Sequence, residues 1–84
     1  MSSSDHISLL VLTPENTILD RNVSKVSLPG SKGRFMILKD HAPLISSLGE
    51  GDIVFESEGR VERIAVLSGF VEVASNKVTV CAEV

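Results

Sequence analysis

Residues 70–84, FVEVASNKVTVCAEV, contain the pattern that decides the fold class. Apolar and polar residues alternate along 70–74 and again along 77–84, which is typical of strands with one buried face. Ser75 and Asn76 stand between the two runs, and both residue types favour tight turns. The stretch therefore predicts a β-hairpin. In its second strand Cys81 lies on the face opposite Val80, as a half-buried structural thiol.

The same kind of signal continues through the rest of the chain. Residues 52–57 and 60–68 predict a second hairpin around Glu58-Gly59. Residues 6–13 are apolar on both faces, so we expect a strand that is buried on both sides. Asn22 predicts a break between strands, and Gly69 a bend or bulge. Further strands are expected at 18–19, 23–28, 35–38 and 44–48, with a loop at 29–33; the segment 44–48 could instead form one helical turn.

Turn residues recur about every eight to twelve residues, and no segment makes a convincing helix. This spacing predicts an all-β fold, a sandwich or a small barrel. The 84 residues are enough for a single domain, and 43% of them are hydrophobic, which is sufficient for one core. The longest aliphatic run, residues 9–12, is far too short for a transmembrane helix.

Charge and composition exclude several classes of function. Eight Lys and Arg residues against eleven Asp and Glu residues give a net charge of −3, so no basic stripe suggests nucleic acid or anionic lipid. Three Phe without Trp or Tyr provide no stacking platform. A single cysteine permits no internal disulfide and indicates a reducing compartment. Residues 1–5 lack the basic region of a signal peptide.

The search for catalytic or metal-binding groups yields only weak candidates. Asp40 and His41 could form an acid–base pair or half of a metal site, but adjacent side chains rarely converge on one ligand. We favour an imidazole that braces the loop by hydrogen bonding. Residues 30–34, GSKGR, look like a phosphate cradle, but a strand rather than a helix follows them, so an exposed charged turn is favoured. We therefore expect no catalytic residue, no metal site and no cofactor, and a chain that binds other proteins.

Three segments resemble one family. Residues 30–45, GSKGRFMILKDHAPLI, resemble the segment GSEGELGILPGHAPLL of the ε subunit of F-type ATP synthases. Residues 67–73, LSGFVEV, resemble its LSGGFVEV segment, and residues 76–83, NKVTVCAE, resemble NKVTVLAD. Residues 18–20 and 23–26 fall in register as well. The similarity covers essentially the whole chain, so the chain is identified as a member of this family.

The resemblance implies a flattened β-sandwich of about ten short strands. It implies a non-catalytic subunit of the rotor, or central stalk, which couples proton transport to ATP synthesis by linking the γ subunit to the membrane c-ring. The catalytic α/β head would be reached only indirectly. The implied location is the cytoplasmic face of the bacterial inner membrane, with membrane association only through the complex. By resemblance, the c-ring interface contains Lys32, Gly33 and Arg34, and the γ interface contains Thr13, His41, Ala42 and Pro43.

The chain departs from the family pattern in two respects. The family usually has acidic residues at the positions of Lys32 and Arg34, and it has Pro-Gly where Lys39-Asp40 stand. We therefore expect acidic or neutral residues in the facing c-ring loop, because like charges across an interface are unfavourable. The sequence also ends where the family's C-terminal helical hairpin would begin. The regulation and the ATP site that the hairpin provides are therefore not expected here.

Two other classes of function compete with a rotor subunit. A small β-barrel that binds proteins or nucleic acid is the main alternative, although a nucleic-acid barrel needs aromatic residues and cations on one face. A small enzyme is the other, and the empty search for a site disfavours it.

Overall fold

The computed structural model describes residues 6–84, so residues 1–5, with the signal-peptide prediction that concerns them, lie outside the described residues. Nine strands and no helix form within the described part of the chain. The strands are β1 (Ile7–Leu12), β2 (Thr17–Val23), β3 (Lys25–Gly30), β4 (Gly33–Ile37), β5 (Leu44–Leu48), β6 (Gly51–Ser57), β7 (Arg60–Val66), β8 (Ser68–Ala74) and β9 (Lys77–Glu83).

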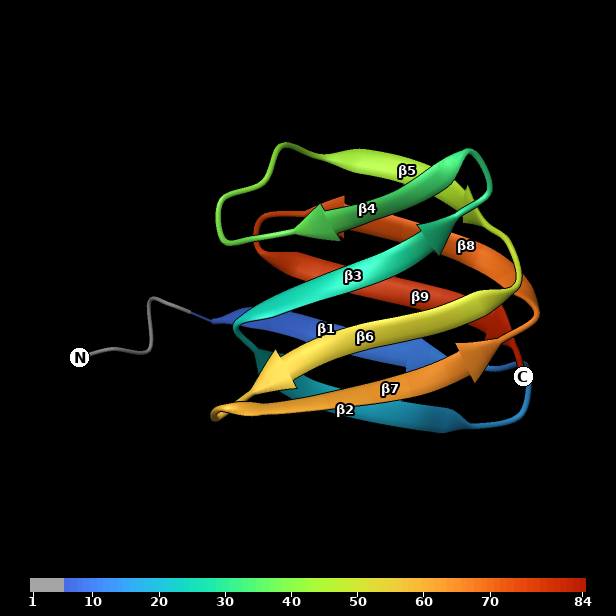
Figure 1. The fold of residues 1–84 in the computed structure, drawn as a ribbon, viewed down its shortest axis with the longest axis horizontal. Coiled ribbons are helices and arrows are strands. Elements are labelled where there is room, and N and C mark those ends of the chain that lie inside the picture. The colour runs from blue at the N-terminus through green and yellow to red at the C-terminus, as the bar shows by residue number, and fades with distance from the viewer. Residues whose placement is uncertain (1–5) are drawn as a thin grey trace.

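The strands form one curled sheet with the order β2-β1-β9-β8-β5-β3-β6-β7, and β4 pairs with β3. The β1–β9 pair is parallel, whereas every other pair is antiparallel. Curling brings β4, β3, β6 and β7 in front of β5, β8, β9, β1 and β2 (Figure 1). We call these groups the front layer and the back layer. The sheet passes from one layer to the other between β5 and β3, where Gly30 pairs with Leu48.

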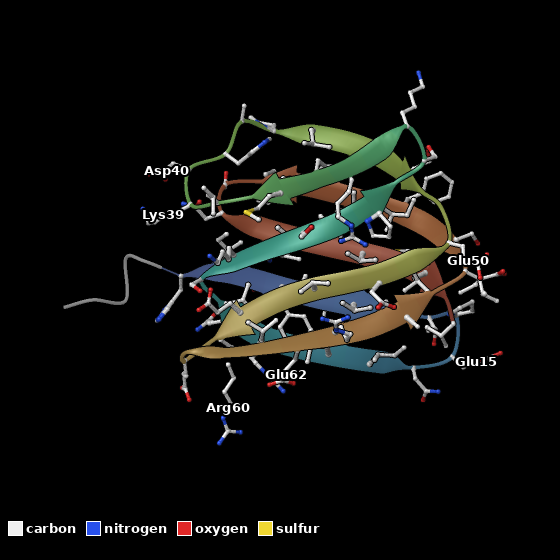
Figure 2. All side chains as sticks on the ribbon, in the orientation of Figure 1. Glu15, Lys39, Asp40, Glu50, Arg60 and Glu62 are labelled. Carbon is white, nitrogen blue, oxygen red and sulfur yellow. The ribbon has the colours of Figure 1, made fainter. Side chains whose placement is uncertain are left out.

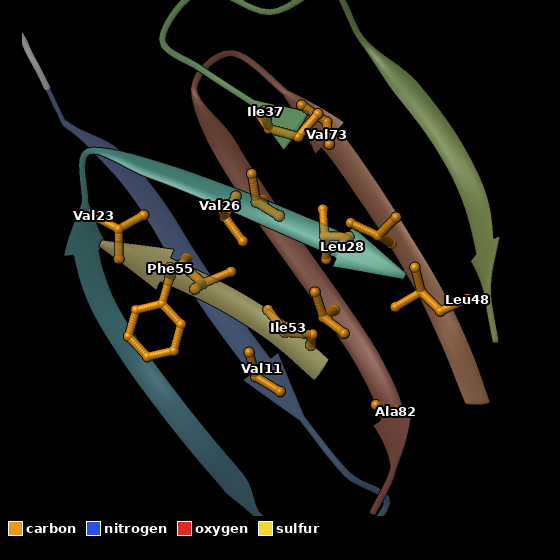
Figure 3. Packing of buried hydrophobic residues seen from close by; sticks show 14 of the residues in the cluster. Val11, Val23, Val26, Leu28, Ile37, Leu48, Ile53, Phe55, Val73 and Ala82 are labelled. Atoms are coloured by element: carbon orange, nitrogen blue, oxygen red, sulfur yellow. The ribbon is translucent and has the colours of Figure 1, made fainter. Parts of the chain in front are cut away.

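The core lies between the two layers and is built by the alternation of each strand (Figure 3). In β1 the side chains of every second residue are fully buried, beginning with Ile7. No polar or charged side chain is buried within residues 6–84. The buried cluster comprises Ile7, Leu9, Val11, Val23, Val26, Leu28, Ile37, Leu48, Ile53, Phe55, Val66, Val71, Val73, Val78, Val80 and Ala82.

The edge strand β2 approaches β6 and β7 and narrows the opening between the layers. The Ser24 amide donates to the Glu56 carbonyl at 2.8 Å, and the Ser57 hydroxyl donates to the Asn22 carbonyl at 3.2 Å. The Arg21 guanidinium forms an ion pair with Glu62 at 2.8 Å. These contacts tie the sheet's first strands to its last, so the fold lies between a sandwich and a closed barrel.

The all-β fold expected from the sequence is confirmed, with nine strands in residues 6–84 where the resemblance implied about ten. Both predicted hairpins form, and residues 44–48 form a strand rather than a helical turn. Asn22 does not break a strand, because β2 extends through it by pairing with β1 opposite Ser8. The predicted loop at 29–33 shortens to a turn at 31–32, since Pro29 and Gly30 belong to β3.

Two expectations about burial were wrong. The second face of β1, which carries Leu10 and Leu12, is half-buried rather than covered. Cys81 is exposed rather than half-buried. The reason is the same for both, because these side chains point away from the core on the outer face of the back layer, and no other layer covers that face within the described residues.

Candidate functional site

The outer face of the back layer carries a row of uncovered apolar side chains. Phe70 of β8 pairs with Cys81 of β9, which in turn pairs with Leu12 of β1. The Phe70 side chain is 64% exposed, and Ile45 on the neighbouring β5 is 77% exposed. Single exposed apolar residues are common on proteins, but a contiguous group across several strands is typical of an interaction surface.

A hollow of about 580 Å³ lies where this row reaches the end of the sandwich. Gly69 is among the residues that line the hollow. The strands β8 and β9 approach each other closely there, so a Cβ at Gly69 would collide with the Cys81 carbonyl oxygen. The hollow is lined by Leu12, Thr13, Pro14, Ser47, Leu48, Ser68, Gly69, Phe70, Cys81, Ala82 and Glu83.

The outer face of the front layer is different in character. Lys25 forms an ion pair with Glu56 at 3.3 Å, and Arg63 approaches Asp52 at 3.7 Å. Exposed ion pairs of this kind add little stability but keep a face hydrated. This face also exposes Met36 and Val61, but Met36 pairs with Ser27 and Val61 with Glu56, so the back layer carries the more continuous row of apolar side chains.

The turn between β3 and β4 holds the residues assigned by resemblance to the c-ring interface. Gly30 and Gly33 pair at its base, and a Cβ on Gly30 would lie 2.6 Å from the Gly33 carbonyl oxygen. Lys32 is exposed at the tip. Arg34, in contrast, is tied to the front layer, donating to the Ser27 hydroxyl at 2.9 Å and to the Asp52 carbonyl at 2.7 Å. The charge of Lys32 is thus exposed at the tip of the turn, whereas the guanidinium of Arg34 is held by hydrogen bonds to the front layer.

The loop between β4 and β5 holds three of the residues assigned to the γ interface. The His41 amide donates to the Leu38 carbonyl at 3.2 Å, which closes a turn. The His41 Nδ1 atom donates to the Ala42 carbonyl at 2.6 Å, so the imidazole braces the loop, which confirms the structural interpretation of this histidine. Ala42 and Pro43 are exposed, and His41 is half-buried.

The structure does not bring all the predicted γ-facing residues together. Thr13 directly follows β1, which ends on the side of the sandwich that carries the β3–β4 turn, whereas residues 41–43 belong to the β4–β5 loop at the opposite end, beside the β8–β9 hairpin (Figure 1). Figure 2 shows these ends, with Glu50 and Glu15 at the first and Asp40 at the second. The Thr13 hydroxyl also accepts from the Asn16 amide at 3.1 Å and so stabilises the β1–β2 turn.

The described residues contain neither a group of three potential metal-ligating side chains nor a helix long and apolar enough to span a membrane. The candidate residues are those of the two turns and the apolar outer face.

Comparison with known proteins places this sandwich in a family. The family model described as ATP synthase, Delta/Epsilon chain, beta-sandwich domain matches residues 6–84. The chain belongs to this family. Members share the fold deduced above, and the resemblance inferred from residues 30–45 is thereby confirmed.

Two relatives illustrate the match. The ATP synthase epsilon chain of Desulfitobacterium hafniense is 47% identical over 76 residues, which cover 90% of this chain and 58% of the relative. That of Carboxydothermus hydrogenoformans is 46% identical over 79 residues, which cover 94% and 59%. The chain thus spans less than two thirds of the length of these epsilon chains.

Solved structures agree on the fold. A chain in the mitochondrial ATP synthase of Euglena gracilis superposes with a TM-score of 0.88 at 21% identity, covering 93% of this chain and 51% of that one. A chain in the central stalk and c-ring of the Tetrahymena thermophila mitochondrial ATP synthase gives 0.77 at 14% identity, covering 92% and 63%. At sequence identities this low, the comparison with these two structures shows a shared fold only.

The sequence contained a signal for the apolar outer face that was not used to propose a site. Phe70 alternates with the buried residues Val71 and Val73, which placed an aromatic ring on the outer side of β8. The contact between Asp40 and Asn76, in contrast, had no local signal, because 36 residues separate the two partners.

Proposed function

We propose that this chain serves as the β-sandwich of an ε subunit in the central stalk of an ATP synthase. In this role it links the γ subunit to the c-ring, performs no catalytic step itself and reaches the α/β head only through γ. The family match over residues 6–84 carries the proposal. Its place would be the cytoplasmic face of the bacterial inner membrane, where the complex holds it.

For the γ subunit we propose the outer face of the back layer, with Thr13 at one end and His41, Ala42 and Pro43 at the other. The row formed by Phe70, Cys81 and Leu12 lies beside Thr13 on this face, and it supports an apolar interface at that end of the sandwich. Burial of such apolar side chains supplies most of the favourable free energy of association.

For the c-ring we propose the β3–β4 turn, with Lys32 as its free charge. Arg34 already donates to Ser27 and Asp52, so its guanidinium stabilises the turn and contributes less to a partner. The family usually has acidic residues at the positions of Lys32 and Arg34. Of these two reversed charges, Lys32 is therefore the one that mainly faces a partner. We expect acidic or neutral residues opposite Lys32 in the c-ring loop.

Coupling requires a body that transmits torque between two interfaces without deforming. A single core that joins both layers, inside an envelope of 36 × 23 × 20 Å, supports such rigidity. Thr13 of the proposed γ surface and Lys32 of the proposed c-ring surface lie at the same end of the sandwich. Torque would therefore pass between the two surfaces over a short distance.

The test is binding of the purified chain to the γ subunit and to γ–c-ring assemblies of the same organism. We expect association with γ alone and tighter association with the assembly, since two interfaces then act together. A single-stranded oligonucleotide tests the barrel alternative. Binding to the oligonucleotide without binding to γ would overturn the proposal.

A pair of variants tests the c-ring surface. Lys32→Ala should weaken binding to the γ–c-ring assembly about three- to tenfold and leave binding to γ alone unchanged. Arg34→Ala is the matched cation in the same turn, and its main effect should be on stability. Equal losses of c-ring binding for both variants would show that Lys32 has no special part.

A further inference from the structure

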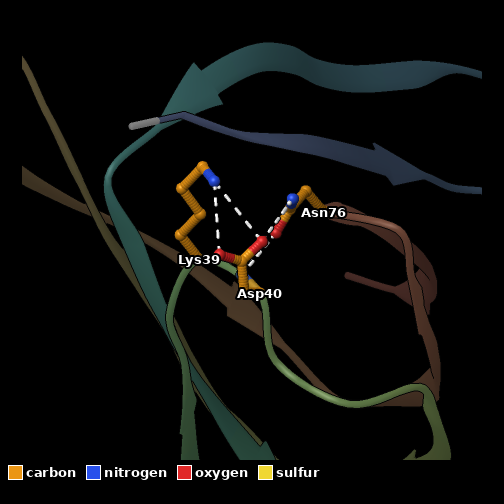
Figure 4. Close-up of polar contacts among 3 residues, drawn as sticks. All are labelled: Lys39, Asp40 and Asn76. Atoms are coloured by element: carbon orange, nitrogen blue, oxygen red, sulfur yellow. Dashed lines mark hydrogen bonds and ion pairs between the residues drawn. The ribbon is translucent and has the colours of Figure 1, made fainter. Parts of the chain in front are cut away.

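Asn76 joins three segments that are distant in sequence. Its carbonyl oxygen accepts from the Ser8 amide at the start of β1 at 2.9 Å. Its side chain contacts Asp40 in the β4–β5 loop, where the Asn76 Nδ2 atom donates to Asp40 Oδ1 at 3.1 Å (Figure 4). The Asp40 amide in turn donates to Asn76 Oδ1 at 2.5 Å. The two residues thus exchange a pair of hydrogen bonds.

The backbone at Asp40 needs such support. Residues 38–41 form a turn closed by the His41 amide, and Asp40, its third residue, has a φ of 64°. A positive φ at this position characterises a type II turn, which favours glycine or asparagine there. An aspartate tolerates this conformation better than most residues but still at some cost. The bonds to Asn76 and the contact of Lys39 Nζ with the Asp40 carboxylate, at 3.3 Å, offset that cost.

The bonds to Asn76 are also the loop's link to the rest of the fold. Within the described chain, Asn76 is the one residue outside the loop that hydrogen-bonds any of residues 39–43. The exposed Ala42 and Pro43 follow directly after this anchor. Loss of the anchor would leave residues 39–43 held by the local turn and by β5 alone.

We propose that Asp40 and Asn76 form a clip that presets residues 41–43 for binding to γ, and that both are positioning residues. This inference rests on the proposed function, because it takes the partner from there. A preset loop keeps the binding-competent conformation populated, and apparent affinity falls in proportion when that population falls. Lost preorganisation slows association, whereas a lost direct contact mainly speeds dissociation.

The experiment measures association and dissociation rates of the full chain with the purified γ subunit. Asp40→Gly removes the carboxylate and Asn76→Gly removes the carboxamide, and glycine permits the positive φ at both positions, 64° at Asp40 and 61° at Asn76. Asp40→Gly keeps the backbone amide that donates to Asn76 Oδ1, whereas Asn76→Gly loses both bonds. We therefore expect Asn76→Gly to slow association about tenfold and Asp40→Gly to slow it less, both with little change in dissociation, and the double variant to match Asn76→Gly. Asp40→Asn keeps an oxygen acceptor and should remain within about twofold of the unchanged chain.

Ser75→Gly is the matched control, because Ser75 has a φ of 51° in the same hairpin turn and should bind like the unchanged chain. Hydrogen exchange of residues 39–43 in the free chain gives a readout independent of γ, and it should rise in Asn76→Gly. Unchanged association by Asn76→Gly, additive effects of the two glycine variants, or unchanged exchange in Asn76→Gly would each overturn the clip. If the unchanged chain fails to bind γ, the proposed function fails, and the exchange result still decides whether the clip exists.

Discussion

At the scale of single residues, the turn at 38–41 shows what the sequence could predict. Pro43 predicted irregular chain before β5, and the structure has it. The positive φ at Asp40 explains why Pro-Gly suits this place in the family pattern, since Pro and Gly are favoured at the two central positions of a type II turn. The clip to Asn76 could not be predicted, because it depends on how β4, β8 and β9 are placed in space.

The carboxyl group of Asp40 makes part of the stability pH-dependent. Its pKa lies below the ordinary value of 3.8, because Asn76 donates to it and because Lys39 donates to it and attracts its charge. A carboxyl whose folded-state pKa is lowered stabilises the fold above its unfolded pKa, and this contribution is lost as pH falls through the folded pKa.

We therefore expect the free energy of unfolding of the chain to fall relative to that of Asp40→Asn as pH falls from about 5 to below 3.8, since the amide does not titrate in this range. Urea unfolding of both proteins across this range measures the effect. A difference in the free energy of unfolding that stays constant with pH would contradict it.

Glycine is required at position 69 because the backbones of β8 and β9 approach each other closely there, and not because the chain bends. The sequence marked it as a bend or bulge, yet it lies inside β8 opposite Ala82, where a Cβ would collide with the Cys81 carbonyl and lie 2.9 Å from the Ala82 Cα. Gly69→Ala should lower the free energy of unfolding by about 2 kcal/mol, because backbone atoms must move apart. In the control Gly49→Ala, the nearest atom to the new Cβ is 3.8 Å away. Similar losses in urea unfolding for both variants would exclude steric crowding at Gly69.

At the scale of elements, strands with one buried face were predictable and the edge strand was not. Ser75 and Asn76 both have positive φ values, as a two-residue hairpin turn requires, and their types pointed to it. In β2, by contrast, Leu19 and Val23 are the residues that are not exposed. The alternation of apolar and polar residues in β2 is therefore too weak to predict a strand of this length. Its extended conformation depends on pairing with β1.

Arg21 is one of the residues through which β2 contacts the front layer. Its guanidinium carbon lies 5.6 Å from the centre of the Phe55 ring and its Nη1 atom pairs with Glu62. Arg21→Ala should lower the free energy of unfolding by about 1 kcal/mol through loss of both contacts. Arg63→Ala, whose ion pair is longer and more exposed, should cost less than about 0.5 kcal/mol. Equal values from urea unfolding would mean that Arg21 adds nothing beyond a surface charge.

At the scale of the whole molecule, the two outer faces determine how the sandwich can be used. Alternation within each strand indicates which side chains point outward, as it did for Phe70 and Cys81. It does not indicate which strands lie side by side, so the sequence could not assemble Leu12, Cys81 and Phe70 into one row. That assembly requires the parallel β1–β9 pair, which joins the first and last strands of the chain.

This difference between the faces leads to a test with matched exposed residues. Phe70 is 64% exposed on the back layer, and Met36 is 51% exposed on β4 of the front layer. Threonine suits a strand at either position, so Phe70→Thr and Met36→Thr should each change the free energy of unfolding by less than about 0.5 kcal/mol. Phe70→Thr should weaken binding to γ about tenfold or more, as expected for an aromatic residue at the centre of an interface. Met36→Thr should leave binding to γ unchanged. Titration of both variants against γ measures the effect, and a greater loss for Met36→Thr would place the interface on the front layer, because only a contacting face responds to removal of its exposed apolar side chains.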